Sequence, residues 1–198
     1  ETVAGLKLPG LNLSRSKLSG VDFSKCNLAG ADFSETDLFG ADFSHADLTK
    51  ANFTDADLRG ARFFKANLTD ANLHGVDLRH GEVLMATHDG VQAQEKRKEN
   101  VRQRQVRMVA ANLSEAAMAN AVVAQADLSG AVLQNVDLSG ANLSKSNLMD
   151  CDLSGADLSG ADMTGVNLSK ADLSGAQVIG ATLRGAEIVG TSLAGVDL

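Results

Sequence analysis

Large apolar residues recur at every fifth position along nearly the whole chain. A step of five from Val3 reaches Val83 without meeting a polar residue, and the same register resumes at Met108 and runs to Leu198. Two residues before nearly every large residue stands a small one, usually Ala, with Asp or Asn in most repeats between the two. The chain is therefore an array of five-residue repeats that is interrupted once.

A period of five fits neither an amphipathic helix nor a long strand. A helix repeats every ~3.6 residues and a strand every ~2, so either element would carry the apolar positions round to solvent. The chain must instead turn once per repeat, with the small and the large residue inward. The pattern predicts an all-β solenoid in which stacked neighbours stabilise each coil.

The order of the large residues limits the number of sides. From Phe23 to Phe63 the large residue alternates between Phe and Leu, so identical residues lie ten positions apart. Three sides would mix Phe and Leu in one stack. An even number of sides per coil is the simplest arrangement.

Two segments resemble the pentapeptide-repeat family, whose motif is A(D/N)LxX: AGADFSETDLFGADFSHADLTKANFTDADL and LSGADLSGADMTGVNLSKADLSGA. The resemblance extends over nearly the whole chain outside the interruption. It implies a right-handed quadrilateral β-helix with four repeats per coil, about nine coils in all, and a rod roughly 40 Å long at ~4.8 Å per stacked strand. Residues 20 apart then stack, so Phe23, Phe43 and Phe63 line one inner face and Phe33 and Phe53 the opposite one.

The interruption is interpreted as a segment expelled from the rod. From Val83 to Met108 the distance is 25 residues where five are expected, which leaves 20 in excess, the length of one coil. Threading them as a coil would point Lys96 and Lys98 inward. Burying an unpaired Lys costs several kcal/mol.

Three segments follow from this interpretation. Residues 1–83 and 108–198 are expected to form the coils of one solenoid, and residues 84–107 a charged insertion loop that is partly helical at most. Joining Met85 directly to Val106 should leave the faces aligned.

Both cysteines fall in the small inward column. Cys26 and Cys151 are many coils apart, far beyond the ~7 Å that a disulfide allows between Cα atoms. We expect two reduced, buried thiols.

Charge is distributed unevenly along the chain. Residues 1–83 carry 9 basic and 12 acidic groups, residues 84–107 carry 6 and 3, and residues 108–198 carry 3 and 10, for a net charge of −7. A basic insertion therefore leaves an acidic rod. The uneven charge also has an explanation without any function: Asp is a residue of the repeat motif, and the insertion is a charged segment exposed to solvent.

Four faces also predict a candidate contact surface for an acidic partner. The last position of one face carries a ladder of basic residues, Lys25, His45 and Lys65. Phe64 directly precedes Lys65. Arg59 and Arg79 stack beside Phe39 on the preceding face, with Arg62 near the same corner, whereas Glu35, Asp55 and Glu115 are expected together on another face. The candidate partner-binding residues are Lys25, His45, Lys65, Arg59, Arg79, Phe39, Phe64, Arg97, Arg102 and Arg104.

No motif in the sequence indicates catalysis. His74, His80 and His88 are too loosely spaced for a metal site, and the glycines end repeats rather than cradling phosphate. We expect a protein that is not an enzyme and that uses no cofactor and no metal.

The leading functional hypothesis is a non-catalytic interaction scaffold that presents a rigid four-sided rod and a basic loop to a protein partner. The resemblance implies an alternative, a DNA-mimicking protein that binds DNA gyrase and protects it from quinolones. The very regular repeats, the basic insertion and the lack of a recognisable C-terminal dimerisation segment depart from that alternative. The overall negative charge and the absence of Tyr and Trp argue against direct nucleic-acid binding.

Two further expectations concern location and ends. No stretch approaches the ~18 to 20 apolar residues of a membrane span, and no signal segment opens the chain, so we expect a cytoplasmic protein without membrane contact. The last coil ends in register without a cap, which favours flanking parts of a longer protein as covers. An end-to-end homodimer that buries Leu193 and Leu198 is the alternative.

Overall fold

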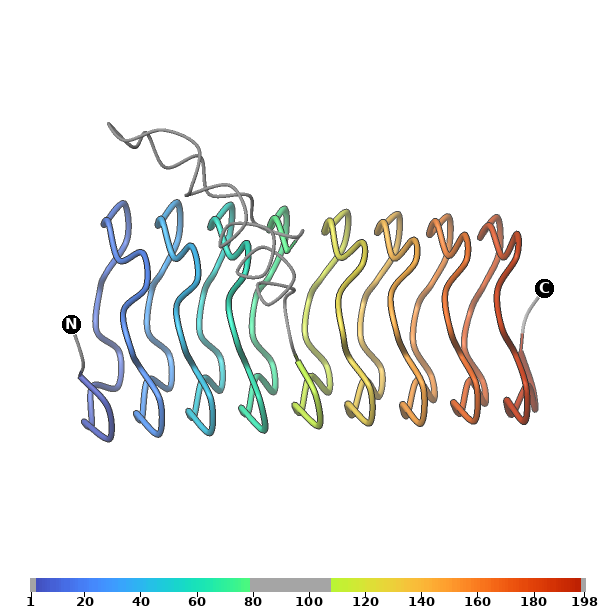
Figure 1. The fold of residues 1–198 in the computed structure, drawn as a ribbon, viewed down its shortest axis with the longest axis horizontal. Coiled ribbons are helices and arrows are strands. Elements are labelled where there is room, and N and C mark those ends of the chain that lie inside the picture. Colours follow the sequence, from blue (N-terminus) through green and yellow to red (C-terminus); the bar gives the residue numbers. More distant parts are fainter. Residues whose placement is uncertain (1–2, 79–107, 197–198) are drawn as a thin grey trace, which may run out of the picture.

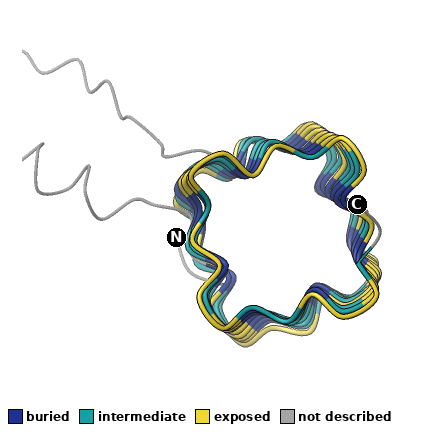
Figure 2. Ribbon diagram, turned by 90° about the vertical axis from the view of Figure 1, so that its right-hand side faces the viewer, coloured by how far each residue is buried: buried dark blue, intermediate teal, exposed yellow. Residues whose placement is uncertain are grey.

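The protein is a four-sided rod of stacked coils (Figure 1). This computed structural model describes residues 3–78 and 108–196. Neither described range contains a helix, and every strand in them is a single bridging residue. Viewed along its axis the rod has a square outline, with buried residues inside and exposed residues at the corners (Figure 2). The quadrilateral β-helix predicted from the sequence is confirmed.

Parallel bridges join residues that are 20 apart, such as Asn27 to Asp47. Along the rod the N–H of a large inward residue donates to the next coil, as Leu28 does to the Asp47 carbonyl at 2.7 Å. In return, the N–H of Asp47 donates to the Cys26 carbonyl at 2.9 Å. After Leu28 the chain makes a tight turn, in which the Ala31 N–H donates to the Leu28 carbonyl at 3.0 Å. Each coil is thus hydrogen-bonded to both of its neighbours, which is why the repeats are stable only when stacked.

We number the four faces by their large inward residues and name each corner by the two faces that it joins. Face 1 begins with Val3, face 2 with Leu8, face 3 with Leu13 and face 4 with Leu18. In the N-terminal half, face 1 continues with Phe23, Phe43 and Phe63, face 2 with Leu28, Leu48 and Leu68, face 3 with Phe33, Phe53 and Leu73, and face 4 with Leu38, Leu58 and Leu78.

The phenylalanine rows of the core lie as the alternation predicted. Phe43 is stacked between Phe23 and Phe63, with ring centroids 5.1 Å away on both sides. It also meets Phe33 and Phe53 of the opposite face edge-on, at 5.6 and 5.7 Å. The two rows therefore interlock in the middle of the rod, and their geometry matches the arrangements that aromatic pairs prefer.

The outward Asp and Asn residues serve the fold. The carboxylate of Asp32 accepts the backbone N–H of Ser34 at 3.0 Å, and that of Asp172 accepts the N–H and the hydroxyl of Ser174. These hydrogen bonds hold the pKa of Asp32 and of Asp172 below the usual value of an aspartate. The carboxylates of Asp32 and Asp172 are thus held as anions by their own turns.

Polar residues in the small inward column donate to an equivalent backbone carbonyl, that of the large residue 23 positions earlier. Cys26 Sγ donates to the Val3 carbonyl at 3.1 Å, and Cys151 Sγ donates to the Leu128 carbonyl at 3.0 Å, in both cases 23 residues earlier. Both thiols are buried and free, as predicted. The hydroxyls of Thr36, Ser146 and Thr191 reach the equivalent carbonyls.

Cys151 is expected to resist thiol reagents in the folded protein. Burial raises the pKa of its thiol to about 12, so almost no reactive thiolate exists at pH 8. Mass spectrometry after a brief maleimide treatment should find Cys151 unmodified in native protein and modified in denaturant. Equal labelling in both conditions would contradict the buried position.

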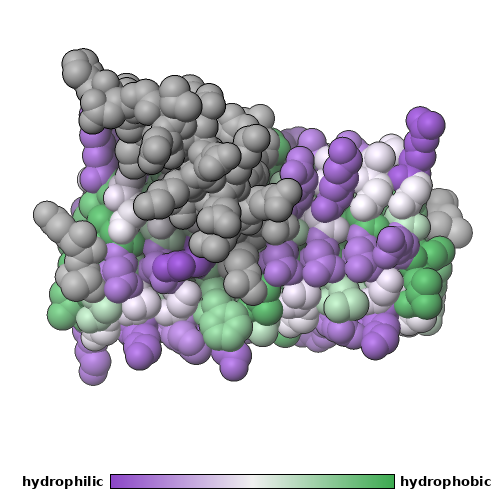
Figure 3. Space-filling view, in the orientation of Figure 1, coloured by the Kyte–Doolittle hydropathy of each residue, from purple (hydrophilic) through white to green (hydrophobic). Residues whose placement is uncertain are grey.

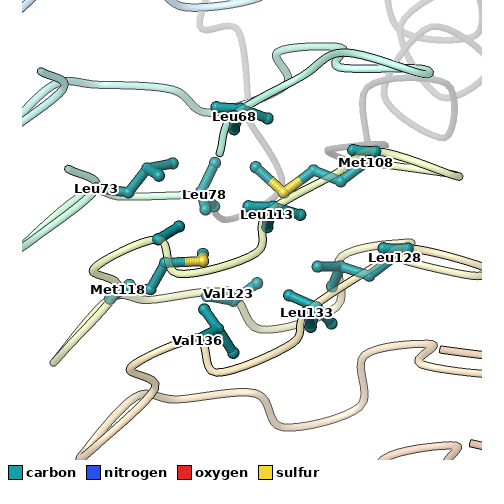
Figure 4. Close-up of a cluster of buried hydrophobic side chains, with 14 of the residues drawn as sticks. Leu68, Leu73, Leu78, Met108, Leu113, Met118, Val123, Leu128, Leu133 and Val136 are labelled. Carbon is teal, nitrogen blue, oxygen red and sulfur yellow. The ribbon is translucent and has the colours of Figure 1, made fainter. Parts of the chain in front are cut away.

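The coils continue directly across the interruption, but in a different register from the one expected. Asn67 bridges Asn112, and Asp77 bridges Val122, so partners that are otherwise 20 apart are here 45 apart. The excess is therefore 25 residues and not 20. Figure 4 shows the large side chains on the two sides of the interruption packed in one cluster.

Met108 occupies the place that the sequence assigned to Val83. The N–H of Lys65 donates to the Val109 carbonyl at 3.1 Å, which puts Met108 on face 1, next to Phe63. Val83 and the expected insertion at 84–107 lie outside the described residues. The expected register, with Val83 next to Phe63 in the stack, was therefore wrong, whereas the boundary at residue 83 stays a prediction.

This correction turns every later face by one side relative to the expectation. The N–H of Asp70 donates to the Ser114 carbonyl at 3.1 Å, so Glu115 stacks on Asp70 at corner 2/3. Glu35 and Asp55 lie at corner 3/4. The expected grouping of Glu115 with those two residues was therefore wrong.

Apolar side chains gather at the ends of the rod, most visibly at the C-terminal end (Figure 3). Leu193 is 51% exposed there, and Ile188 is 53% exposed. Leu198 lies outside the described residues, so the end-to-end contact stays a prediction. Nothing in the described ranges forms a helix that could cross a membrane.

Candidate protein-binding face

The basic ladder lies at corner 1/2. Lys25, His45 and Lys65 follow the large residues of face 1, and their side chains are exposed. The N–H of Lys25 donates to the Ser44 carbonyl at 2.9 Å, and that of His45 to the Phe64 carbonyl at 2.8 Å. The three residues are therefore in one stack, at the spacing of adjacent strands.

Phe64 gives this corner an aromatic centre. Its ring is turned outward and 38% exposed, at a position where many repeats have Ser or Thr. The His45 ring meets it edge-on, with centroids 5.4 Å apart, and the Lys65 Nζ lies 5.3 Å from the Phe64 centroid. A cation near an aromatic face is attracted to it, and a partly covered aromatic side chain beside cations is typical of a binding hot spot.

Apolar surface continues from Phe64 across the interruption. Val109 follows Phe64 at corner 1/2, is half-buried, and also replaces the usual Ser or Thr. The first described range ends at Leu78 on face 4 and the second begins at Met108 on face 1, on the two sides of corner 4/1. The interruption therefore borders the same face as the ladder.

Arg59 is less available than the sequence indicated. Its Cζ lies 5.9 Å from the Phe39 ring centroid, as expected for stacked neighbours at corner 4/1. However, its guanidinium forms an ion pair with the Asp57 carboxylate at 2.6 Å. The hydrogen bond from Arg59 to Asp57 raises the pKa of Arg59, and the negative charges of Asp77 and Asp37 raise it further. This charge is balanced by the aspartates of face 4.

Arg62 is similarly paired. Its guanidinium contacts the Asp42 carboxylate of the preceding coil at 2.5 Å on face 1. Lys25 and Lys65, the two lysines of the ladder at corner 1/2, have no such ion pair within the described ranges, and Lys65 is the one that lies beside Phe64. Outside those ranges lie Arg79, Arg97, Arg102 and Arg104, and their expected role stays a prediction.

The histidines do not converge in the described part of the chain. His74 is exposed at corner 3/4, while His80 and His88 lie outside the described residues. Within residues 3–78 and 108–196, no group of three His, Cys, Asp or Glu side chains could hold a metal ion.

A family model for pentapeptide repeats matches the chain in eight copies. The matched residues are 7–44, 16–55, 41–80, 111–148, 146–185 and 164–198. The chain therefore belongs to the pentapeptide-repeat family. No curated protein sequence is significantly similar to it.

Solved structures of the family have the same fold. HetL from the cyanobacterium Nostoc sp. strain PCC 7120, a pentapeptide-repeat protein involved in heterocyst differentiation regulation, is 27% identical at a TM-score of 0.64, over 100% of this chain and 86% of HetL. QnrB1, a plasmid-mediated fluoroquinolone resistance protein in its trypsin-treated M102R form, is 19% identical at a TM-score of 0.60, over 98% of this chain and 91% of that one. The second likeness shows the fold alone.

Proposed function

We propose that this pentapeptide-repeat protein is a non-catalytic scaffold that holds an acidic protein partner on face 1. The observation that carries the proposal is the cluster of Phe64, His45 and Lys65. It combines an exposed aromatic ring with two basic side chains on a backbone that is hydrogen-bonded on both sides. Such a surface needs no rearrangement to bind, which favours affinity.

The chemistry of the outward residues supports a structural role over catalysis. Asp and Ser are abundant, but the motif aspartates accept hydrogen bonds from their own turns, and those bonds lower the pKa of Asp32, Asp162 and Asp172. A general acid or base works best with a pKa near the operating pH. These carboxylates are shifted away from it.

Gyrase binding stays a prediction from the family resemblance, because no contact within the described residues bears on it. The cytoplasmic location is likewise part of the proposal.

Charge reversal on face 1 should weaken binding of an acidic probe. A fluorescein-labelled Glu-rich peptide of about five residues with one central Phe reaches ~16 Å when extended, enough to cover the ladder. In the Lys25→Glu/Lys65→Glu variant its Kd, measured by anisotropy, should rise about tenfold. Phe64→Ala should also weaken binding.

The matched control is Lys7→Glu/Lys50→Glu, which changes the net charge equally on face 2 and corner 2/3. It should leave the affinity unchanged. Equal weakening in both double variants would show that only net charge matters and would overturn the proposal.

A further inference from the structure

We infer that the binding surface runs along face 1 past the interruption and includes Lys145, Lys170 and Arg184. This inference rests on the proposed function. It follows from the corrected register, which changes the corner of every residue after the interruption.

Hydrogen bonds fix the positions of these three residues. Face 1 passes from Met108 to Leu128, Leu148 and Leu168, each step marked by a bond to the next coil of 2.8 to 2.9 Å. Lys170 follows Leu168 and therefore lies at corner 1/2, in the same column as Lys25 and Lys65.

Lys145 and Arg184 lie at the other edge of face 1. Lys145 follows Leu143, and Arg184 follows Leu183, and both leucines belong to face 4. Both basic residues are therefore at corner 4/1. The described C-terminal half has no other Lys or Arg, so all of its basic residues border face 1.

The opposite side of the same half carries only acidic charge. Asp137 and Asp157 stack on face 3, and Glu115 lies at corner 2/3. The described C-terminal half is thus polarised across its width, because all of its Lys and Arg residues border face 1, whereas the charged groups around face 3 are carboxylates. An acidic partner approaching the rod is steered toward face 1.

The two lysine stems lie along the corners over glycines of the next coil. Lys145 Cγ is 3.7 Å from where a Cβ on Gly165 would stand, and Lys170 Cγ is 3.7 Å from the same point on Gly190. Both lysines are exposed. The stems rest on the rod while the ammonium groups stay in solvent, as is usual for amphipathic side chains.

The chemistry of face 1 favours an acidic protein segment over nucleic acid. Asp127, Asp150 and Glu187 lie among the cations of its C-terminal half. Duplex DNA carries one charge per ~1.7 Å, so its phosphates would meet these carboxylates. A protein segment can place its acidic groups opposite the cations and neutral groups opposite the carboxylates.

A longer probe tests the extension. The Glu-rich peptide lengthened with Glu and Ser to about 12 residues spans ~40 Å when extended. In Lys145→Glu/Lys170→Glu, its Kd should rise about fivefold, while the short probe binds as it does to the wild type. Lys7→Glu/Lys50→Glu should leave both probes unaffected.

The binding results separate the extension along face 1 from the proposed function and from the class of partner. If the long probe ignores Lys145→Glu/Lys170→Glu but responds to Lys25→Glu/Lys65→Glu, the extension fails and the proposed function stands. If neither pair matters, the proposed function fails. If a duplex DNA of the same length binds face 1 more tightly than the long peptide, the assignment to a protein segment is overturned.

Discussion

Phe43→Ala is expected to destabilise the rod by about 3 to 5 kcal/mol, the range for removing a large buried aromatic side chain. Phe43 is fully buried and has four aromatic neighbours, two stacked at 5.1 Å and two edge-on at 5.6 and 5.7 Å. The Phe43 N–H donates to the Arg62 carbonyl of the next coil, and the N–H of the adjacent Asp42 donates to the Val21 carbonyl of the preceding one, so the cavity cannot close easily. A urea titration followed by circular dichroism measures the effect.

Phe64→Ala is the matched control, because it removes the same side chain from the outside of the neighbouring coil. Phe64 is already 38% exposed, so its loss should cost less than ~1 kcal/mol. If the two variants unfold at the same urea concentration, Phe43 is not more buried than Phe64, which would contradict the assignment of the inward and outward positions.

The second large effect concerns deletion of the interruption. Removing residues 83–107, which is 25 residues, should leave all faces in line. Gly81 and Glu82 would then precede Met108 in the places of the small and the polar motif residue. Removing residues 86–105, which joins Met85 to Val106, also keeps the period of five but leaves one repeat more than the longer deletion does.

The shorter deletion should therefore turn the C-terminal half by one side. Corner residues of adjacent coils are a strand spacing apart, close enough for two cysteines to be bridged by a short thiol cross-linker. With residues 83–107 removed, Lys65→Cys should be cross-linked to Ala110→Cys. With residues 86–105 removed, Asp70→Cys should be cross-linked to Ala110→Cys instead. The same pair reacting in both deletions would contradict the register argument.

The sequence was sufficient to predict the fold and the interlocked core. A period of five requires one turn per repeat, and the alternation of Phe and Leu makes an even number of sides the simplest arrangement. Both arguments depend on local spacing, which the interruption does not disturb. The number of four sides, and with it the stacking of Lys25, His45 and Lys65, came instead from the resemblance to the pentapeptide-repeat family.

The register beyond the interruption could not be predicted in this way. Gly81, Glu82 and Val83 resemble a repeat, so the sequence offers Val83 as the last core residue. Excesses of 20 and 25 residues both preserve the period of five and place only apolar residues inward. Only the bridges between coils distinguish them, and those bridges bring Lys170 into the column of Lys25.

The available charge of Arg59 was also overestimated from the sequence. Arg59 and Asp57 are two residues apart on the same side of the backbone, near enough for the ion pair at 2.6 Å. The sequence contained that signal.

The most direct test of the central claim, one continuous rod in which face 1 passes from Phe63 to Met108, uses the full-length chain. Cys26 and Cys151 are first replaced by Ala, the usual residue of their column. Lys65→Cys with Ala110→Cys should then be cross-linked within one chain nearly completely, because the Lys65 N–H donates to the Val109 carbonyl at 3.1 Å. Asp70→Cys with Ala110→Cys should remain largely uncross-linked. Efficient cross-linking of the second pair in place of the first would contradict the account.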